Sequence, residues 1–320
     1  ARGRDTVAET FPLSRFVTQW REAIMEAADT HAKTHTGVAT KAAQRVGVPV
    51  LMSYIASPHT TGGYIREALR REHGVVSCGG QIPDEVLLQW GFQAPIPDYP
   101  RHDIALPAIR DVNQLRSTLP KNFNPALLLW VDSGQAEMDK PLAALEIPKA
   151  AWFIDTHVAT EHRIEIARHF DYVYLAQRAQ IAEFEAAGIP HVRWMPLGCA
   201  PELHAYKRET PRYDVAFVGS VASASGNNRR RFIDRIKAEF PNHFIGQCWP
   251  HEMAEAYTQS KIVVNMCLNQ DVNMRVFEAM ASGALLITDM ADGLDELFDI
   301  GQDLVVYKDD DDAVALIAHY

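Results

Sequence analysis

The chain has 320 residues, of which 47% are hydrophobic and 22% are charged. This balance is typical of a globular protein with room for two domains, and it excludes a disordered or fibrous chain. The net charge of −10 argues against general nucleic-acid binding, which needs a positive surface.

No segment of the sequence predicts a membrane span or an export signal. No apolar run approaches the roughly 18 residues of a spanning helix, and Ala1–Asp5 is not followed by the apolar stretch of a signal peptide. The four cysteines are scattered without metal-ligand spacing, so we expect reduced thiols and no metal site. These features predict a cytoplasmic protein without a transmembrane segment.

Residues 1–47 are predicted as a helical extension that precedes the main fold. Phe16, Trp20 and Ile24 recur at helical spacing and form one apolar face. Such a helix can pack on the main domain, cover a cleft or form the seam of a homo-oligomer. The pattern leaves these alternatives open.

Residues 48–205 are predicted as a first Rossmann-like domain, because strands and helices alternate along them. The expected strands include 50–57, 75–78, 124–132, 150–157, 172–176 and 191–195. Chemistry in such sheets lies at the carboxyl ends of the strands. His59, Asp155 and His157 lie there, and along an extended strand Asp155 and His157 would project to the same side. The alternative for His59 is a loop residue bonded to the backbone.

Residues 206–320 are predicted as a second Rossmann-like domain, which begins with a strand that ends at Gly219 and Ser220. A loop of small residues then leads into a helix that starts with three arginines, Arg229 to Arg231. Cations are unusual at this place, since a helix start favours anions. Either a bound phosphate explains them or they are solvated. The acidic run 309–312 is interpreted as helix capping rather than a metal site.

The segment Asn273–Asp289 predicts a short helix, a glycine stop at Gly283 and a buried strand. Arg275 and Glu278 are three residues apart and therefore share one face of the helix. A cation and a carboxylate at the open end of an α/β sheet can hold the phosphate and the ribose of a nucleotide. The alternative is a surface ion pair.

The pattern Arg-x-Phe-Glu-Ala-x-Ala-x-Gly-x-x-x-Ile-Thr-Asp in this segment resembles the nucleotide-sugar-binding segment of GT-B glycosyltransferases. It is most similar to the CgeB-like branch of the group 1 enzymes, and the similarity continues through Gly293–Phe298 and Leu304–Tyr307. The resemblance runs from about Val50 to the last residue. It implies an α/β protein with two doubly wound, parallel-sheet, Rossmann-like domains that face a cleft.

By this resemblance the chain moves a sugar from a nucleotide-diphospho sugar, with a UDP-sugar favoured. The acceptor (a glycan, a protein or a small molecule) is left open, and neither a metal nor another cofactor is implied. Glu278 would bind the ribose hydroxyls, while Arg275, with Arg229 or Arg231, would stabilise the leaving diphosphate.

The resemblance also assigns roles to two glycine corners and to a base. Gly62 with Gly63, at the end of a loop expected over residues 58–63, and Gly219 with Ser220 would let the backbone approach the phosphates closely. An inverting enzyme would take its general base from the residues His59, Asp155 and His157.

One position departs from the family pattern. Many retaining group 1 enzymes carry two glutamates that are separated by seven residues, the second at the place of Glu278, but the first falls on Gln270 here. The stereochemical outcome therefore stays open. The alternatives are a nucleotide-sugar epimerase or hydrolase of the same fold, and a non-catalytic nucleotide-sugar-binding or structural protein.

Overall fold

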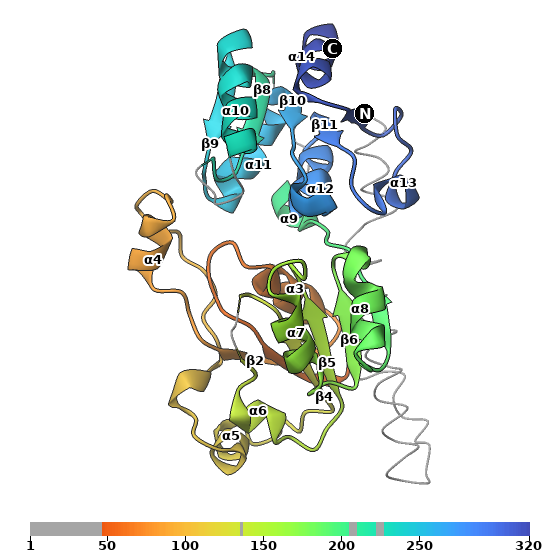
Figure 1. Cartoon of the computed structure of the whole chain (residues 1–320). Helices are drawn as coiled ribbons and strands as arrows, with labels where there is room; N and C mark the ends of the chain where they lie inside the picture. Colours follow the sequence, from red (N-terminus) through yellow and green to blue (C-terminus); the bar gives the residue numbers. More distant parts are fainter. Residues whose placement is uncertain (1–46, 135–136, 205–209, 222–226) are drawn as a thin grey trace. The chain divides into compact units, whose positions relative to one another are not determined.

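The computed structural model describes residues 47–134, 137–204, 210–221 and 227–320. The predicted helical extension lies outside these residues, apart from residue 47. Two compact units divide the described chain (Figure 1): 47–83 with 98–196, and 84–97 with 197–320. None of the described helices is long and apolar enough to cross a membrane.

The first unit contains a seven-stranded parallel sheet in the order β3-β2-β1-β4-β5-β6-β7. Its strands are β1 (Pro49–Ser53), β2 (Gly74–Gly79), β3 (Ile104–Ala105), β4 (Leu127–Val131), β5 (Lys149–Phe153), β6 (Tyr172–Leu175) and β7 (Val192–Trp194). The chain builds the sheet outward from β1 on one side and from β4 on the other. The switch point of this doubly wound sheet, where such folds bind ligands, therefore lies between β1 and β4.

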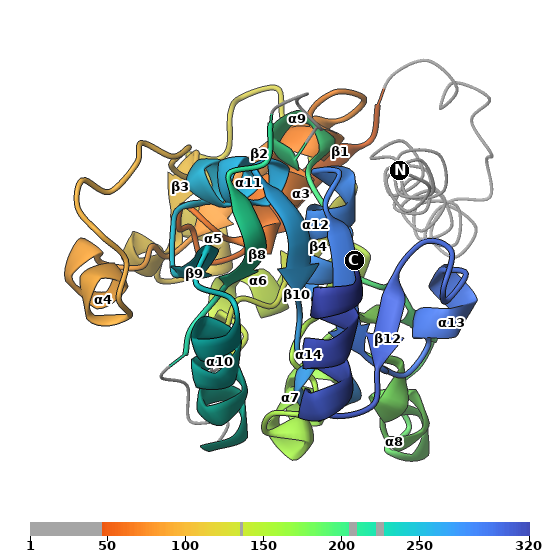
Figure 2. The same ribbon diagram turned by 90° about the horizontal axis from the view of Figure 1, so that it is seen from above.

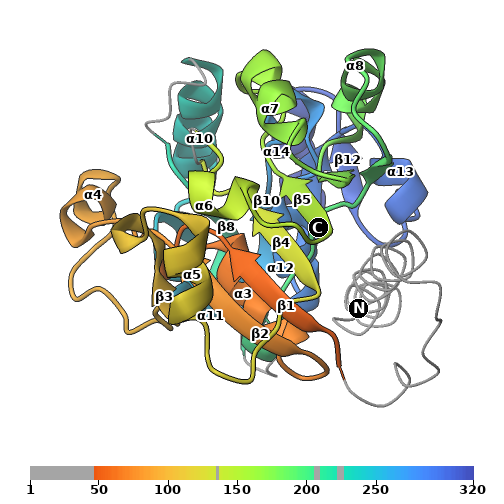
Figure 3. The same cartoon turned by 90° about the horizontal axis from the view of Figure 1, so that it is seen from below.

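The helices of the first unit connect these strands, and Figure 3 shows several of them around β1, β2, β4 and β5. They are α3 (Thr61–Leu69), η2 (Leu106–Ala108), α5 (Val112–Thr118), α6 (Lys140–Ala143), α7 (Thr160–Ala167), η3 (Arg178–Gln180) and α8 (Ile181–Ala186). Every residue of β4 is buried, as expected for a central parallel strand covered on both faces. Its Trp130 ring lies 5.3 Å from Phe153 and 5.7 Å from Phe170, centroid to centroid.

The second unit contains a five-stranded parallel sheet in the order β12-β11-β10-β8-β9. Its strands are β8 (Tyr213–Val218), β9 (His243–Gly246), β10 (Ser260–Val264), β11 (Leu285–Asp289) and β12 (Val305–Tyr307). The chain leaves β8 for β9 on one side and then returns to β10 on the other. Its switch point therefore lies between β8 and β10, which are adjacent in Figure 2.

The helices of the second unit include one from the first half of the sequence. They are α4 (Asp84–Gln89), α9 (Pro201–His204), α10 (Asn227–Glu239), α11 (Pro250–Thr258), η4 (Leu268–Gln270), α12 (Met274–Ala281), α13 (Leu294–Leu297) and α14 (Asp310–His319). The segment after α4 joins this unit because Phe92 stacks on Trp249, with ring centroids 4.4 Å apart. The Trp249 indole also donates a hydrogen bond to the Gln93 carbonyl at 2.9 Å. The domain boundaries drawn from the sequence stay a prediction.

Two local expectations about the first unit are wrong. Gly62 and Gly63 were expected in a loop, but they lie in the first turn of α3, which begins at Thr61. A Cβ atom on Gly62 would lie 2.4 Å from the Tyr54 ring, so glycine lets the helix start pack against β1. The strand expected through residue 157 ends at Phe153. Asp155 has a left-handed backbone (φ 52°), which breaks the alternation expected for an extended chain.

Candidate functional site

The main candidate site lies in the second unit, at the carboxyl end of β8. Gly219 and Ser220 follow this strand directly and so lie at the switch point of the sheet. A Cβ atom on Gly219 would lie 2.5 Å from Nη2 of Arg275, closer than real Cβ contacts allow. Glycine at this position therefore leaves room for the guanidinium of Arg275.

Arg275 extends from α12 toward the end of β8 and is fixed there by three contacts. Its Nε donates to the Val218 carbonyl at 2.7 Å, and its Nη1 donates to Oδ1 of Asn265 at 2.5 Å. Its guanidinium carbon lies 4.8 Å from the centroid of the Phe217 ring, within the range of a cation–π contact. The charge is thus held in one orientation, as an oriented anion-binding group requires.

Arg229 brings a second guanidinium to the same place from the first turn of α10. Its side chain is buried, and it donates to the carbonyls of Ser220 at 3.3 Å and Met266 at 3.4 Å. Its guanidinium carbon lies 5.9 Å from the centroid of the Phe217 ring. Burial, and then repulsion from Arg275, lower the pKa of Arg229.

The charges of these two arginines are not balanced by an ion pair among the described residues. Asp289 acts on Arg229 electrostatically, but its own pKa is raised by burial, and its Oδ1 accepts a hydrogen bond from the Cys267 amide at 2.6 Å. Uncompensated buried charge is unfavourable. The arrangement therefore suits an anion bound between the two guanidiniums.

The other predicted basic residue does not join this site. Arg231 is exposed, and its Nη2 lies 3.5 Å from Oδ1 of Asn228, one turn back on α10. Of the three arginines at the helix start, only Arg229 is buried. The solvated alternative thus describes Arg231, while Arg229 has the surroundings of a ligand-binding residue.

Glu278 lies on α12, but it forms no ion pair with Arg275. It is 6% exposed, so the alternative of a surface ion pair is wrong. Its Oε1 lies 3.6 Å from Nε2 of His204, a fully buried residue at the end of α9. Burial raises the pKa of Glu278 to about 7 although Arg275 opposes this, and burial lowers the pKa of His204 to about 4.

Sequence reasoning missed Asn265, whose side chain fixes the guanidinium of Arg275. The residue is fully buried; its Oδ1 accepts from Arg275, and its Nδ2 donates to Oγ1 of Thr288 at 3.0 Å. The sequence signal that could have revealed this residue is a single amide side chain in the otherwise apolar stretch that forms β10 and the residues directly after it. A buried amide needs partners, and here those partners fix Arg275.

In the first unit, the predicted catalytic residues lie after β1 and β5. His59 precedes α3, and burial lowers its pKa. Asp155 and His157 lie in a turn after β5, and a ligand atom of one lies within 4.8 Å of a ligand atom of the other. The extended geometry expected for this pair is wrong, but the turn still brings the two side chains together. His157 Nδ1 is buried and has no hydrogen-bond partner among the described residues.

Sequence reasoning also missed an ion pair that contacts the turn after β5. Arg163 on α7 donates from Nε to Oδ2 of Asp132 at 2.8 Å, and from Nη1 to the Val158 carbonyl inside the turn. Asp132 follows β4 and is buried, so its pKa is raised by burial while Arg163 opposes the rise. The pair therefore links the end of β4 to the turn that carries His157.

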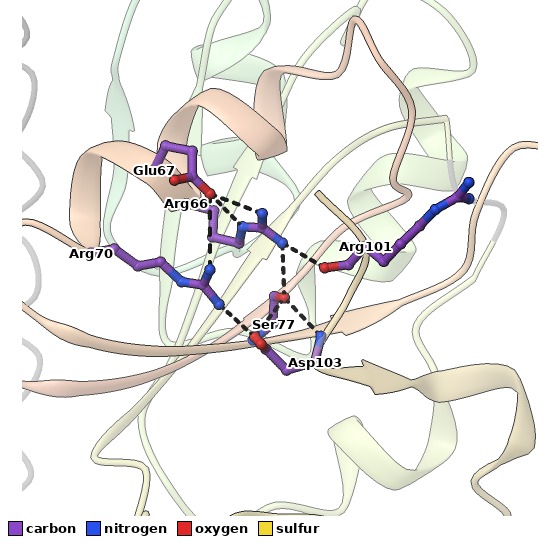
Figure 4. A network of polar contacts seen from close by, with 6 residues as sticks. All are labelled: Arg66, Glu67, Arg70, Ser77, Arg101 and Asp103. Carbon is purple, nitrogen blue, oxygen red and sulfur yellow. Dashed lines mark hydrogen bonds and ion pairs between the residues drawn. The ribbon is translucent and has the colours of Figure 1, made fainter. Parts of the chain in front are cut away.

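The glycine corner of α3 is anchored by a separate polar network (Figure 4). Arg66 on α3 is 1% exposed and donates to the Arg101 carbonyl at 2.9 Å and to Oγ of Ser77 at 3.3 Å. Asp103 accepts from the Ser77 amide and from Arg70, each at 2.7 Å. These contacts join α3 to β2 and so fix the orientation of the helix whose first turn contains Gly62 and Gly63.

Comparisons with known proteins agree with this fold. A sequence model of the family described as "Glycosyl transferase-like" matches residues 203–320. A search of curated proteins gives no match. An alpha-glucosyltransferase solved in complex with UDP and a 13-mer DNA is similar in structure, with a TM-score of 0.54 and 12% identity over 85% of this chain and 90% of that chain.

Two further solved structures are similar. HepE from Anabaena, in complex with UDP and glucose, has a TM-score of 0.53 and 14% identity over 84% of this chain and 89% of its own. Sucrose-phosphate synthase from Thermosynechococcus elongatus has a TM-score of 0.50 and 15% identity over 85% and 89%. The family match covers residues 203–320, and the two parallel-sheet units of the chain share the GT-B fold of these structures.

Proposed function

We propose that this protein transfers a sugar from a nucleotide-diphospho sugar, with a UDP-sugar favoured, to an acceptor hydroxyl, without a metal ion. The observation that carries the proposal is the pair of guanidiniums of Arg229 and Arg275 at the carboxyl end of β8, neither of them in an ion pair among the described residues. When the bond between the sugar and the diphosphate breaks, negative charge develops on the leaving oxygen. Oriented cations at that oxygen stabilise the transition state more than the ground state.

Helix α12, which carries Arg275, would also contact the nucleotide part of the sugar donor. Glu278 would accept hydrogen bonds from the ribose hydroxyls. HepE and the alpha-glucosyltransferase were solved in complex with UDP, which supports uracil as the base of the nucleotide here. The small residues Gly219 and Ser220 would leave the backbone at the end of β8 open to the diphosphate.

Whether a protein side chain acts as the general base depends on the stereochemistry of transfer. If the reaction inverts, one of His59, Asp155 and His157 takes the proton of the acceptor hydroxyl as that oxygen attacks the anomeric carbon. His157 is favoured among them because the turn after β5 brings a ring nitrogen of His157 within 4.8 Å of the carboxylate of Asp155, which can orient the ring. If the reaction retains the configuration, the leaving diphosphate can take this proton. Gln270 stands where many retaining enzymes have a glutamate, so this residue bears on the stereochemical assignment.

The experiment is thermal unfolding with UDP, GDP and TDP, on the wild type and on three single arginine variants. A ligand at 100 times its Kd stabilises the folded state by about 2.7 kcal/mol, which raises Tm by several degrees. We expect this rise with UDP in the wild type and in Arg231→Ala, which removes an exposed arginine of the same helix. It should be lost in Arg229→Ala and Arg275→Ala. No rise with any nucleotide in the wild type contradicts the proposal, as does an equal rise in all three variants.

A further inference from the structure

We propose that His204 is a positioning residue for Glu278, and that the two side chains share a single proton whose release accompanies nucleotide binding. This inference rests on the proposed function, in which Glu278 binds the ribose. The motif at residues 273–289 does not include His204, which lies on α9.

The tautomer of His204 follows from its contacts. Its Nδ1 lies 3.0 Å from the Ala200 carbonyl oxygen. Because a carbonyl oxygen can only accept, Nδ1 must carry the hydrogen. In the neutral ring Nε2 then has a lone pair, and this atom is buried, lacks a hydrogen-bond partner in the described chain and faces Oε1 of Glu278 at 3.6 Å.

Without an extra proton, two buried acceptors would face each other. The lone pair of Nε2 and the carboxylate of Glu278 would repel, and neither would gain a hydrogen bond. One proton between them removes the conflict, either as a carboxylic acid that donates to Nε2 or as an imidazolium that donates to the carboxylate. Burial raises the pKa of Glu278 and lowers that of His204, so the proton resides on Glu278.

The other groups around the pair do not supply a competing charge switch near neutral pH. The groups that interact electrostatically with Glu278 are Arg275, Cys199, Cys248 and Tyr257. Burial raises the pKa of both cysteines to about 12 and also raises that of Tyr257, so all three stay neutral. Arg275 stays cationic and favours the ionised form of Glu278.

Binding should therefore release the proton. Ribose hydroxyls donate hydrogen bonds, so they favour the carboxylate of Glu278 over the carboxylic acid. The pKa of Glu278, about 7 in the free protein, falls in the complex. The sign follows from linkage: nucleotide affinity is full above pH 7 and decreases as the pH falls below it, by up to tenfold per pH unit.

The experiment is titration calorimetry with UDP between pH 5.5 and 8.5, in two buffers with different ionisation enthalpies, which gives the number of protons released. Three proteins are compared: the wild type, Glu278→Gln and His204→Asn. The asparagine amide can still donate to Ala200, but it lacks the acceptor at Nε2. The terminal phosphate of UDP also titrates near pH 6, equally for all three, so the differences between them report Glu278.

We expect the wild type to release more protons than Glu278→Gln near pH 6.5, by roughly one half to one proton. In His204→Asn this excess should move to lower pH, because the acid form of Glu278 has lost its acceptor. If all three release equal numbers at every pH while UDP binds, the proton-sharing inference is wrong and nucleotide binding stands. If UDP binds none of them at any pH, the proposed function itself fails.

Discussion

Arg229 and Arg275 come from different helices, yet both guanidiniums lie against the one ring of Phe217, at 5.9 Å and 4.8 Å from its centroid. Arg275 donates to a carbonyl at the end of β8, and Arg229 donates to carbonyls in the loops that follow β8 and β10. Carbonyl contacts orient a guanidinium without neutralising it, so the positive charge stays available. Contact with the aromatic ring stabilises each guanidinium and offsets part of the repulsion between them.

Gly219→Ala should disturb this arrangement without a large change in fold. The new methyl group would meet Nη2 of Arg275 at 2.5 Å and displace the flexible guanidinium. The backbone at Gly219 (φ 154°) is one that alanine rarely adopts, so some stability is lost as well. We expect UDP affinity to fall about tenfold, since a displaced charge loses roughly 1.4 kcal/mol of interaction. Calorimetric titration at pH 8 measures the change.

The matched control for that variant is Gly301→Ala in the same unit, where the backbone also has a positive φ (81°) but a Cβ atom meets nothing within 4 Å. It should bind UDP like the wild type. Equal affinity of both alanine variants and the wild type would show that the position of Arg275 does not matter for binding.

The sequence predicts the fold well because buried strands and amphipathic helices carry local patterns. The expected strands are present, and the doubly wound order that they imply is found in both units. Strand ends are predicted too long: the run that was expected to reach His157 stops at Phe153 because Asp155 turns the chain. β3 has two residues and lies in a proline-rich stretch, so it leaves no periodic signal.

The site is predicted only where its residues are neighbours in the sequence. Arg275 and Glu278 share a motif, and both lie at or beside the candidate site. His204 and Asn265 reach the same helix from distant parts of the chain, and no spacing rule connects them to it. The sequence also could not show which arginine of the α10 start turns inward, because that depends on the helix phase against β8.

A further prediction concerns Asp132 and Arg163. Removing one partner of a buried ion pair leaves an uncompensated charge, so Arg163→Met should lower the free energy of unfolding by about 3 kcal/mol. The double variant Asp132→Leu with Arg163→Met removes both charges and should recover most of this loss. Urea unfolding measures both. A single variant as stable as the double one would mean that the pair makes no favourable interaction.

The same double variant separates stability from catalysis. Arg163 also donates to the Val158 carbonyl, so the turn with His157 should lose its orientation even when stability returns. We expect release of UDP from a UDP-sugar in the presence of acceptor to fall about a hundredfold in kcat, because misplaced catalytic groups are costly. UDP affinity should stay unchanged. Full recovery of kcat together with stability would leave the pair a structural role only.

The last prediction concerns acid stability and the network in Figure 4. Burial alone would raise the pKa of Asp103, but the hydrogen bonds from Ser77 and the charge of Arg70 outweigh it, so the pKa is lowered from its ordinary value of 3.8. A carboxyl with a lowered folded-state pKa stabilises the protein above its unfolded value, and this stability is lost as the pH falls through the folded value. Asp103→Asn should therefore unfold at lower urea concentration than the wild type at pH 7, and the difference should narrow below about pH 4. Urea midpoints at pH 7, 5 and 3.5 measure it, with Asp98→Asn as the control, because Asp98 forms no hydrogen bond or ion pair within the described chain. A difference that stays constant with pH would show that the amide replacement acts through packing and not through the lost charge.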